Sequence, residues 1–167
     1  MKKTGLFIFL IISVLFYKNA LSQNVSVNVI TQNAGLVKKG AFVFFDVTLN
    51  NTDPVAMAGV YKLKVQVSIA DSSAVIIKST GHSLPTGWQI INNTGTVITL
   101  SNGKDIIAPN DARTLLIALE GKNAGGPVNV SGQLSFSDGV APGTAPGSMA
   151  GDNPADNFST STCTVIH

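Results

Sequence analysis

The strongest constraint on the fold is an alternation of apolar and polar residues with a period of two. It is clearest over 60–69, where the apolar positions are Tyr61, Leu63, Val65, Val67 and Ile69. The segments 41–50 and 128–136 repeat the pattern. Successive side chains of a strand point to opposite faces, so we expect one face of each segment in a core and the other in water.

Turn-forming residues separate these segments and further short apolar runs. The runs lie at 74–78, 88–91, 96–100, 113–120 and 157–166, between clusters rich in Asn, Asp, Pro, Ser and Gly. No window of helical length carries an apolar stripe of period 3.6. Short strands with turns about 8–12 residues apart predict an all-β fold, an immunoglobulin-like antiparallel β-sandwich of about seven to nine strands. A closed barrel is the alternative.

The first 22 residues have the pattern of a cleaved secretory signal peptide. Lys2 and Lys3 precede an apolar run over 6–16, and Ala20 and Ser22 are the small residues before the expected cleavage site. This run is shorter than the roughly 18 residues that cross a bilayer. We therefore expect one sandwich domain over 23–167, secreted or at the cell surface, with no direct membrane span.

The charge balance argues against nucleic acid as a partner. The net charge of the whole chain is +2, but Lys2, Lys3 and Lys18 lie in the expected leader. The remaining 8 Lys and Arg (11 − 3) face 9 Asp and Glu, so the mature charge is −1. No basic stripe is left that would attract nucleic acid or anionic lipid.

Several segments of the second half are similar to a known family. They are 84–88 (Leu84 to Trp88), 96–100, 107–115, 128–135 and 152–157. Together they resemble the immunoglobulin-like conserved-repeat domains, a domain of unknown function, in bacterial and archaeal surface proteins. The resemblance implies a sandwich with a structural or adhesive role and no reaction. Family members usually occur as tandem repeats, whereas this chain carries one copy.

Residues suited to catalysis are few. The two histidines are His82, in a Gly-His-Ser turn, and the final residue His167, so no paired-histidine metal motif can be drawn. Asp71 with Ser72 and His82 supplies the residue types of a triad, but Asp-Ser-Ser is ordinary turn chemistry. We expect no catalytic residues, no cofactor and no enzymatic activity.

The long Gly-, Pro- and Ala-rich loop expected over 138–156 offers one metal hypothesis. Its end carries the oxygen-bearing residues Asp152, Asn153, Asp156 and Asn157, which are the ligand types that Ca²⁺ prefers. Their spacing is not that of an EF-hand loop. Solvated loop polarity is the interpretation we favour, with a calcium site as the alternative.

Trp88 and Cys163 each allow two interpretations. Trp88, the only Trp, is either a core residue of the sandwich or a platform on which a sugar ring stacks. Cys163 is either a small buried residue that alternates with Val165 or half of an intermolecular disulfide. Gly132 falls on the inner face of its strand, where we expect the close approach of a large neighbour such as Trp88.

The first strand of the mature chain suggests how copies could assemble. Val25, Val27 and Val29 alternate with polar residues in 23–31, and a flexible-looking segment follows over 32–40. Such an edge strand suits exchange between subunits, in which main-chain hydrogen bonds join neighbours. We expect a non-catalytic surface module that partners itself or other surface proteins. Within that class, strand donation would make it a fibre subunit. The alternative is a module that binds carbohydrate or another ligand.

Overall fold

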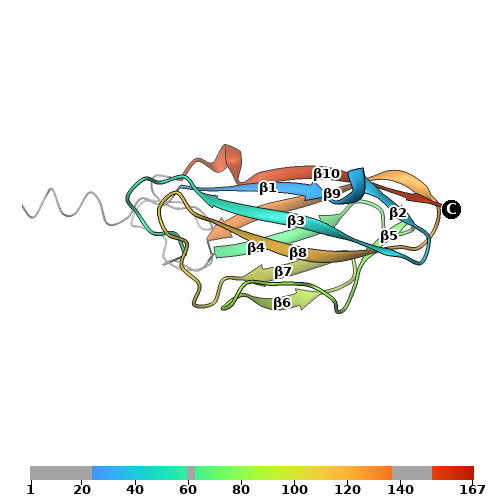
Figure 1. The fold of residues 1–167 in the computed structure, drawn as a ribbon, viewed down its shortest axis with the longest axis horizontal. Helices are drawn as coiled ribbons and strands as arrows, with labels where there is room; N and C mark the ends of the chain where they lie inside the picture. Colours follow the sequence, from blue (N-terminus) through green and yellow to red (C-terminus); the bar gives the residue numbers. More distant parts are fainter. Residues whose placement is uncertain (1–23, 60–62, 137–151) are drawn as a thin grey trace, which may run out of the picture.

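The computed structural model describes residues 24–59, 63–136 and 152–167. Ten strands pack face to face in two sheets (Figure 1), with two short 3₁₀ turns, η1 (Asn33–Gly35) and η2 (Pro154–Asp156). The strands are β1 (Val25–Thr31), β2 (Leu36–Lys38), β3 (Phe42–Asn51), β4 (Leu63–Ile69), β5 (Val75–Ile77), β6 (Gln89–Asn93), β7 (Val97–Ser101), β8 (Ala112–Gly121), β9 (Gly125–Phe136) and β10 (Phe158–Ile166).

The strand order is that of an immunoglobulin-like sandwich. The four-stranded sheet runs β1-β3-β8-β5, and the six-stranded sheet runs β2-β10-β9-β4-β7-β6. The first segment of the chain contributes to both sheets, since β1 pairs with β3 while β2 pairs with β10. The predicted all-β sandwich is confirmed.

One strand, β2, was not expected from the sequence, and its pairing is parallel. β2 spans only three residues and pairs in parallel with β10, with Leu36 opposite Thr164. We expected this stretch to be part of a flexible segment, because three residues are too few to show a period. The sandwich therefore has ten strands in its described part, and one pairing is parallel.

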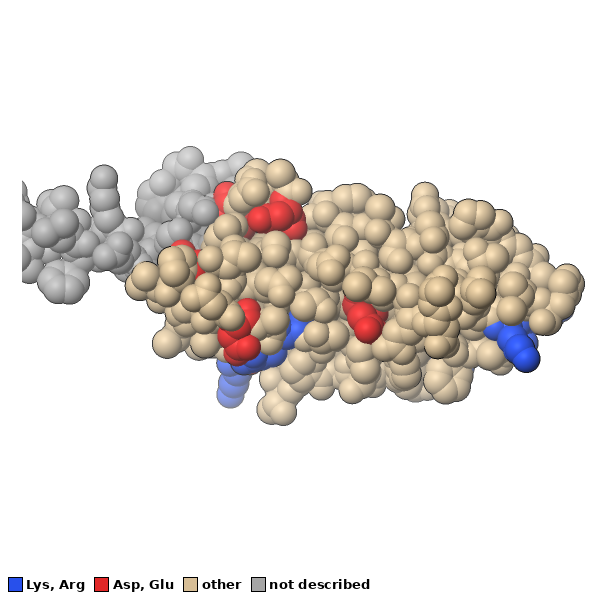
Figure 2. Space-filling view, turned by 45° about the horizontal axis from the view of Figure 1, so that its top comes forward, with Lys and Arg blue, Asp and Glu red and all other residues tan. Residues whose placement is uncertain are grey.

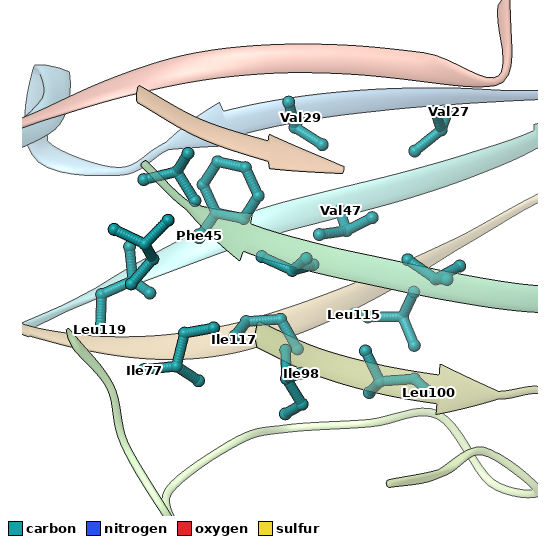
Figure 3. Close-up of a cluster of buried hydrophobic side chains, with 14 of the residues drawn as sticks. Val27, Val29, Phe45, Val47, Ile77, Ile98, Leu100, Leu115, Ile117 and Leu119 are labelled. Atoms are coloured by element: carbon teal, nitrogen blue, oxygen red, sulfur yellow. The ribbon is translucent and has the colours of Figure 1, made fainter. Parts of the chain in front are cut away.

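The core lies between the two sheets and is made by the inward positions of the alternating segments (Figure 3). β3 shows the period most clearly, since its inward residues are buried and its outward ones more accessible. The largest fully buried side chains are Phe45, Leu49, Leu63, Ile77, Ile98, Leu100, Ile107, Leu115, Ile117 and Leu119. Period two predicted the inward residues of β3, β4 and β9, whereas Ile107, in the loop between β7 and β8, is buried without such a pattern.

Gly132 makes room for β1. A Cβ atom at this position would lie 2.7 Å from Cγ1 of Val29 and 3.7 Å from Cγ2 of Val27. The close neighbour that we expected is therefore a pair of β1 valines and not Trp88. β9 is shaped at this point to receive the first strand.

Two of the expected segments fall where the structure describes little or nothing. The predicted signal peptide, 1–22, lies outside the described residues, as does most of the expected loop, from 138 to 151. The end of that loop is described and contains η2. Within the described ranges, no helix is long and apolar enough to cross a membrane.

Candidate functional site

β1 is an edge strand whose apolar face belongs to the core. It pairs antiparallel with β3, from Val25 opposite Asn51 to Thr31 opposite Phe45. Val25, Val27 and Val29 are all buried, and Figure 3 shows the last two pointing in beside Val47. The predicted donor segment is therefore seated within its own chain, where it completes the four-stranded sheet.

The other edge of β1 is held by two serines of the opposite sheet and by Asp152, which lies just before η2. The Val29 amide donates to Ser159 Oγ over 3.2 Å, and the Thr31 amide donates to Ser161 Oγ over 3.1 Å. The Val25 amide donates to Asp152 Oδ1 over 3.4 Å. We call the space between β3 and these three side chains the β1 slot. Its hydroxyl and carboxylate groups satisfy main-chain donors that an edge strand would otherwise leave open.

A left-handed turn connects β1 to the rest of the domain. Asn33, Ala34 and Gly35 have φ values of 54°, 52° and 75°. Asn and Gly tolerate this region, but at Ala34 it is unfavourable because Cβ crowds the following carbonyl. Gly35 is required by packing, since a Cβ there would lie 2.5 Å from the Thr162 carbonyl oxygen. The junction between the first strand and the domain is therefore strained.

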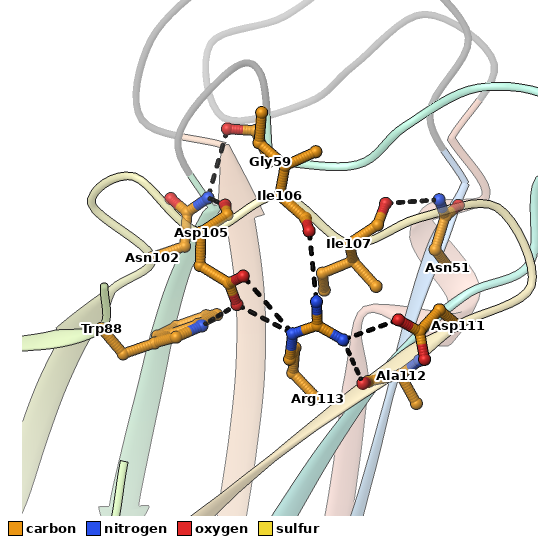
Figure 4. Close-up of polar contacts among 10 residues, drawn as sticks. All are labelled: Asn51, Gly59, Trp88, Asn102, Asp105, Ile106, Ile107, Asp111, Ala112 and Arg113. Carbon is orange, nitrogen blue, oxygen red and sulfur yellow. Dashed lines mark hydrogen bonds and ion pairs between the residues drawn. The ribbon is translucent and has the colours of Figure 1, made fainter. Parts of the chain in front are cut away.

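Trp88 is buried and hydrogen-bonded, so it offers no face for a sugar. Its side chain is 7% exposed, and its Nε1–H donates to Asp105 Oδ2 over 2.9 Å (Figure 4). Asp105 also binds Arg113, whose Nε lies 3.1 Å from Oδ2. This burial argues against the sugar-stacking hypothesis, and Trp88 is a core residue of the sandwich.

Arg113 makes several hydrogen bonds to the loop between β7 and β8 and to the start of β8. It donates to Asp111 Oδ2 over 2.7 Å and to the carbonyl oxygens of Ala112 and Ile106 (Figure 4). The guanidinium lowers the pKa of Asp111, first through this hydrogen bond. Asp105 and Arg113 were not among the site residues predicted from the sequence. The only indication of them in the sequence is that the indole N–H of a buried Trp88 needs a hydrogen-bond acceptor.

The calcium candidates lie close together at the mouth of the β1 slot. Asp152 Oδ2 accepts a hydrogen bond from Asn157 Nδ2, and Asn153 Nδ2 donates to Asp156 Oδ2 over 3.4 Å. Oδ1 of Asp156 and Oδ1 of Asn157 are buried with no hydrogen-bond partner. Burial raises the pKa of Asp152. No group of three His, Cys, Asp or Glu side chains suited to a metal occurs among the described residues.

The residue types of a triad have separate structural tasks. Asp71 Oδ1 accepts from the Ser73 amide over 2.8 Å, which closes a turn. His82 Nδ1 accepts from the Ala118 amide over 3.2 Å, while Nε2 lies 3.0 Å from the Lys78 carbonyl oxygen. Burial lowers the pKa of His82. A neutral ring with the proton on Nε2 satisfies both contacts, so His82 attaches its loop to β8.

Cys163 lies in the core on β10. It is a free cysteine, fully buried, and it alternates with buried Val165. Burial raises the pKa of its thiol. This position agrees with the interpretation of Cys163 as a small buried residue, and not with an intermolecular disulfide, because a thiol inside the folded domain cannot reach another chain.

An aromatic patch lies on the outer face of the four-stranded sheet. Phe42 is 60% exposed and meets Phe44 edge to face, with ring centroids 6.1 Å apart. Lys78 Nζ lies 5.9 Å from the Phe42 ring centroid and 3.0 Å from Glu120 Oε2. Figure 2 shows that uncharged side chains predominate on the surface in view.

Comparison with known proteins shows the fold. No family model matches the chain, and no curated protein matches it in sequence. The CARDB domain of a Pyrococcus furiosus protein, in complex with di-metal ions, has a TM-score of 0.52 at 13% identity, over 89% of this chain and 92% of that chain.

Two cohesins show the same likeness. A cohesin module of a Clostridium perfringens family 33 glycoside hydrolase has a TM-score of 0.51 at 13% identity, over 87% of this chain and 98% of that chain. A non-cellulosomal cohesin from Archaeoglobus fulgidus has a TM-score of 0.51 at 10% identity, over 86% of this chain and 92% of that chain. The expected likeness to bacterial and archaeal immunoglobulin-like modules is confirmed for the fold.

Proposed function

We propose that the mature chain is an exported, non-catalytic structural or adhesive module of the cell surface, and that copies assemble by exchanging β1. The observation that carries this proposal is the combination of an edge strand and a strained left-handed turn, from Asn33 to Gly35, directly after it. Export rests on the leader pattern in 1–22, and a protein partner rests on the low charge of the surface.

Exchange of β1 has a large free-energy barrier but changes the net free energy little. Burial of three valines stabilises the seated strand by roughly 5–9 kcal/mol, at about 1.5–3 kcal/mol each. A copy that loses its own β1 therefore rarely exists in isolation. A strand from a second copy restores the same contacts with β3, Gly132, Ser159 and Ser161. Straightening Ala34 on exchange releases about 1–2 kcal/mol of strain.

This balance suggests when assembly takes place. A folded monomer exchanges slowly, because β1 must leave the core before another strand enters. A chain that folds beside a neighbour after export can accept either strand at once. We therefore propose that assembly accompanies folding outside the cell.

Complementation in trans tests the proposal. A chain beginning at Gln32 is refolded with or without a synthetic peptide of residues 23–31, and unfolding is followed by circular dichroism. We expect cooperative unfolding only with the peptide, and no rescue by a peptide carrying Val27→Asp and Val29→Asp. A truncated chain that is equally stable without the peptide would show that the slot does not need a strand and would reject the proposal.

The aromatic patch supports a second candidate function, the binding of a carbohydrate or another ligand. An exposed ring beside an ion pair offers one apolar face and several hydrogen-bonding groups. On a glycan array, binding that is lost in Phe42→Ala would favour this function. The matched control is Phe158→Ala, because Phe158 on β10 is similarly exposed and lies in the other sheet.

A further inference from the structure

The two sheets end in four edges, and three of them are closed. Ser159 and Ser161 hold the edge of β1. The edge of β5 is covered by the turn between β6 and β7, since the Ile77 amide donates to the Gly95 carbonyl oxygen over 2.8 Å. β2 is only three residues long and ends at Lys38, and short or charged edges resist pairing.

β6 is the remaining edge, and in the described part of the chain a bulge between Ile90 and Asn92 is its only protective feature. It is the last strand of the six-stranded sheet, and in the described part of the chain only β7 pairs with it. Its sequence, from Gln89 to Asn93, contains no charge and no proline. Ile91 is 52% exposed and Ile90 is exposed as well. An uncharged, accessible edge rich in β-branched residues is a template for another strand.

We propose that β6 pairs with β6 of a second copy, antiparallel across a twofold axis through Ile91. This register places Ile91 opposite Ile91, Ile90 opposite Asn92 and Gln89 opposite Asn93, so the apolar contact lies on the axis and the contact between amide side chains lies at each end. Neutral strands with a mature chain charge of only −1 meet without repulsion. The contact is self-complementary, as a twofold interface must be.

The bulge in β6 limits what this edge can build. The register with β7 shifts between Ile90 and Asn92, which leaves Ile91 as the extra residue. A bulge bends a strand and increases its twist, so only a short segment can pair. We therefore expect a closed dimer of modest affinity. This interface is separate from β1, and it would join assembled units side by side.

Sedimentation equilibrium of the mature chain over a range of concentrations tests the dimer. We expect reversible association, and we expect Ile91→Lys to weaken it about tenfold or more because two lysines would face each other at the axis. The matched control is Val55→Lys. Val55 is 73% exposed in the loop after β3, so the same change there should leave association unchanged.

A cysteine placed on the axis tests the register. In a Cys163→Ala background, Ile91→Cys should form disulfide-linked dimers under mild oxidation, and Val55→Cys should not. A mature chain that stays monomeric throughout, or one whose association Ile91→Lys and Val55→Lys weaken equally, would overturn the proposal. Dimers that persist on dilution until the protein is unfolded would point to β1 exchange instead and would also overturn it.

Discussion

Arg113 binds two carboxylates that differ in burial, and we predict that only one of them matters for stability. Asp105 is 12% exposed and accepts from both Trp88 and Arg113, whereas Asp111 is 51% exposed. Asp105→Ala removes the acceptor from a buried indole N–H and a partner from Arg113. Asp111→Ala removes one solvent-screened partner from the same guanidinium.

The expected costs follow from this difference. A hydrogen bond to a charged group contributes about 1.5–3 kcal/mol, and orphaning a buried donor adds to the loss, so Asp105→Ala should cost about 2–4 kcal/mol. An exposed ion pair contributes at most about 1 kcal/mol, so Asp111→Ala should cost no more than that. For a domain of this size, about 1 kcal/mol shifts Tm by roughly 2–4 °C.

Calorimetry and urea unfolding followed by the fluorescence of Trp88, the only Trp, measure both variants. Asp105→Asn should fall between wild type and Asp105→Ala, because a neutral oxygen can still accept from Trp88. Equal losses for Asp105→Ala and Asp111→Ala would refute the reasoning. A larger loss for Asp111→Ala would show that burial does not decide between the two carboxylates.

Three further predictions concern the β1 slot, the pH response and metal. Gly132→Ala should destabilise the domain because its Cβ meets Val29, and Val29→Ala should cost less in that background than in wild type, as measured by a double-mutant cycle in urea. Burial lowers the pKa of His82 below its ordinary value of 6.5, so between the folded-state pKa and pH 6.5 the unfolded chain binds more protons than the folded one. The contribution of His82 to stability should therefore be complete above pH 6.5 and decrease as the pH falls below that value. His82→Gln should flatten the fall in Tm between about pH 7 and 5, and an unchanged slope would assign it to other groups. A chelator should lower Tm by less than about 2 °C, since Asp152 already accepts from Val25 and Asn157; a drop several times larger, lost in Asp152→Ala, would establish a structural metal site.

The strands were predictable because burial on one face imposes a period of two that the sequence displays directly. The core positions of β3, β4 and β9 follow from that period. β2 was not predictable, because three residues carry no period and its parallel partner is far along the chain. A local sequence pattern shows which face of a strand a residue lies on, but it does not show which residue packs against it. For this reason Trp88 was predicted as the neighbour of Gly132, whereas the residue that packs there is Val29.

The candidate site was predictable only in part. The apolar alternation of Val25, Val27 and Val29 identified the edge strand. The hydroxyls that hold it were not recognisable, because Ser159 and Ser161 lie in a run of Ser and Thr in which every position has the same chemistry. The left-handed turn at Ala34 was equally hidden, since alanine carries no preference for that conformation.

An engineered disulfide between β1 and β3 tests the central claim, that β1 passes between copies, most directly. Asn28 and Thr48 face each other across the pair, and directly opposed residues lie within disulfide reach. In a Cys163→Ala background, Asn28→Cys with Thr48→Cys is allowed to assemble while folding at high concentration, oxidised, and run on a denaturing gel without reductant. Exchange of β1 predicts a ladder of covalent multimers that collapses to one band on reduction. Assemblies that yield only monomers with an internal disulfide would contradict the account.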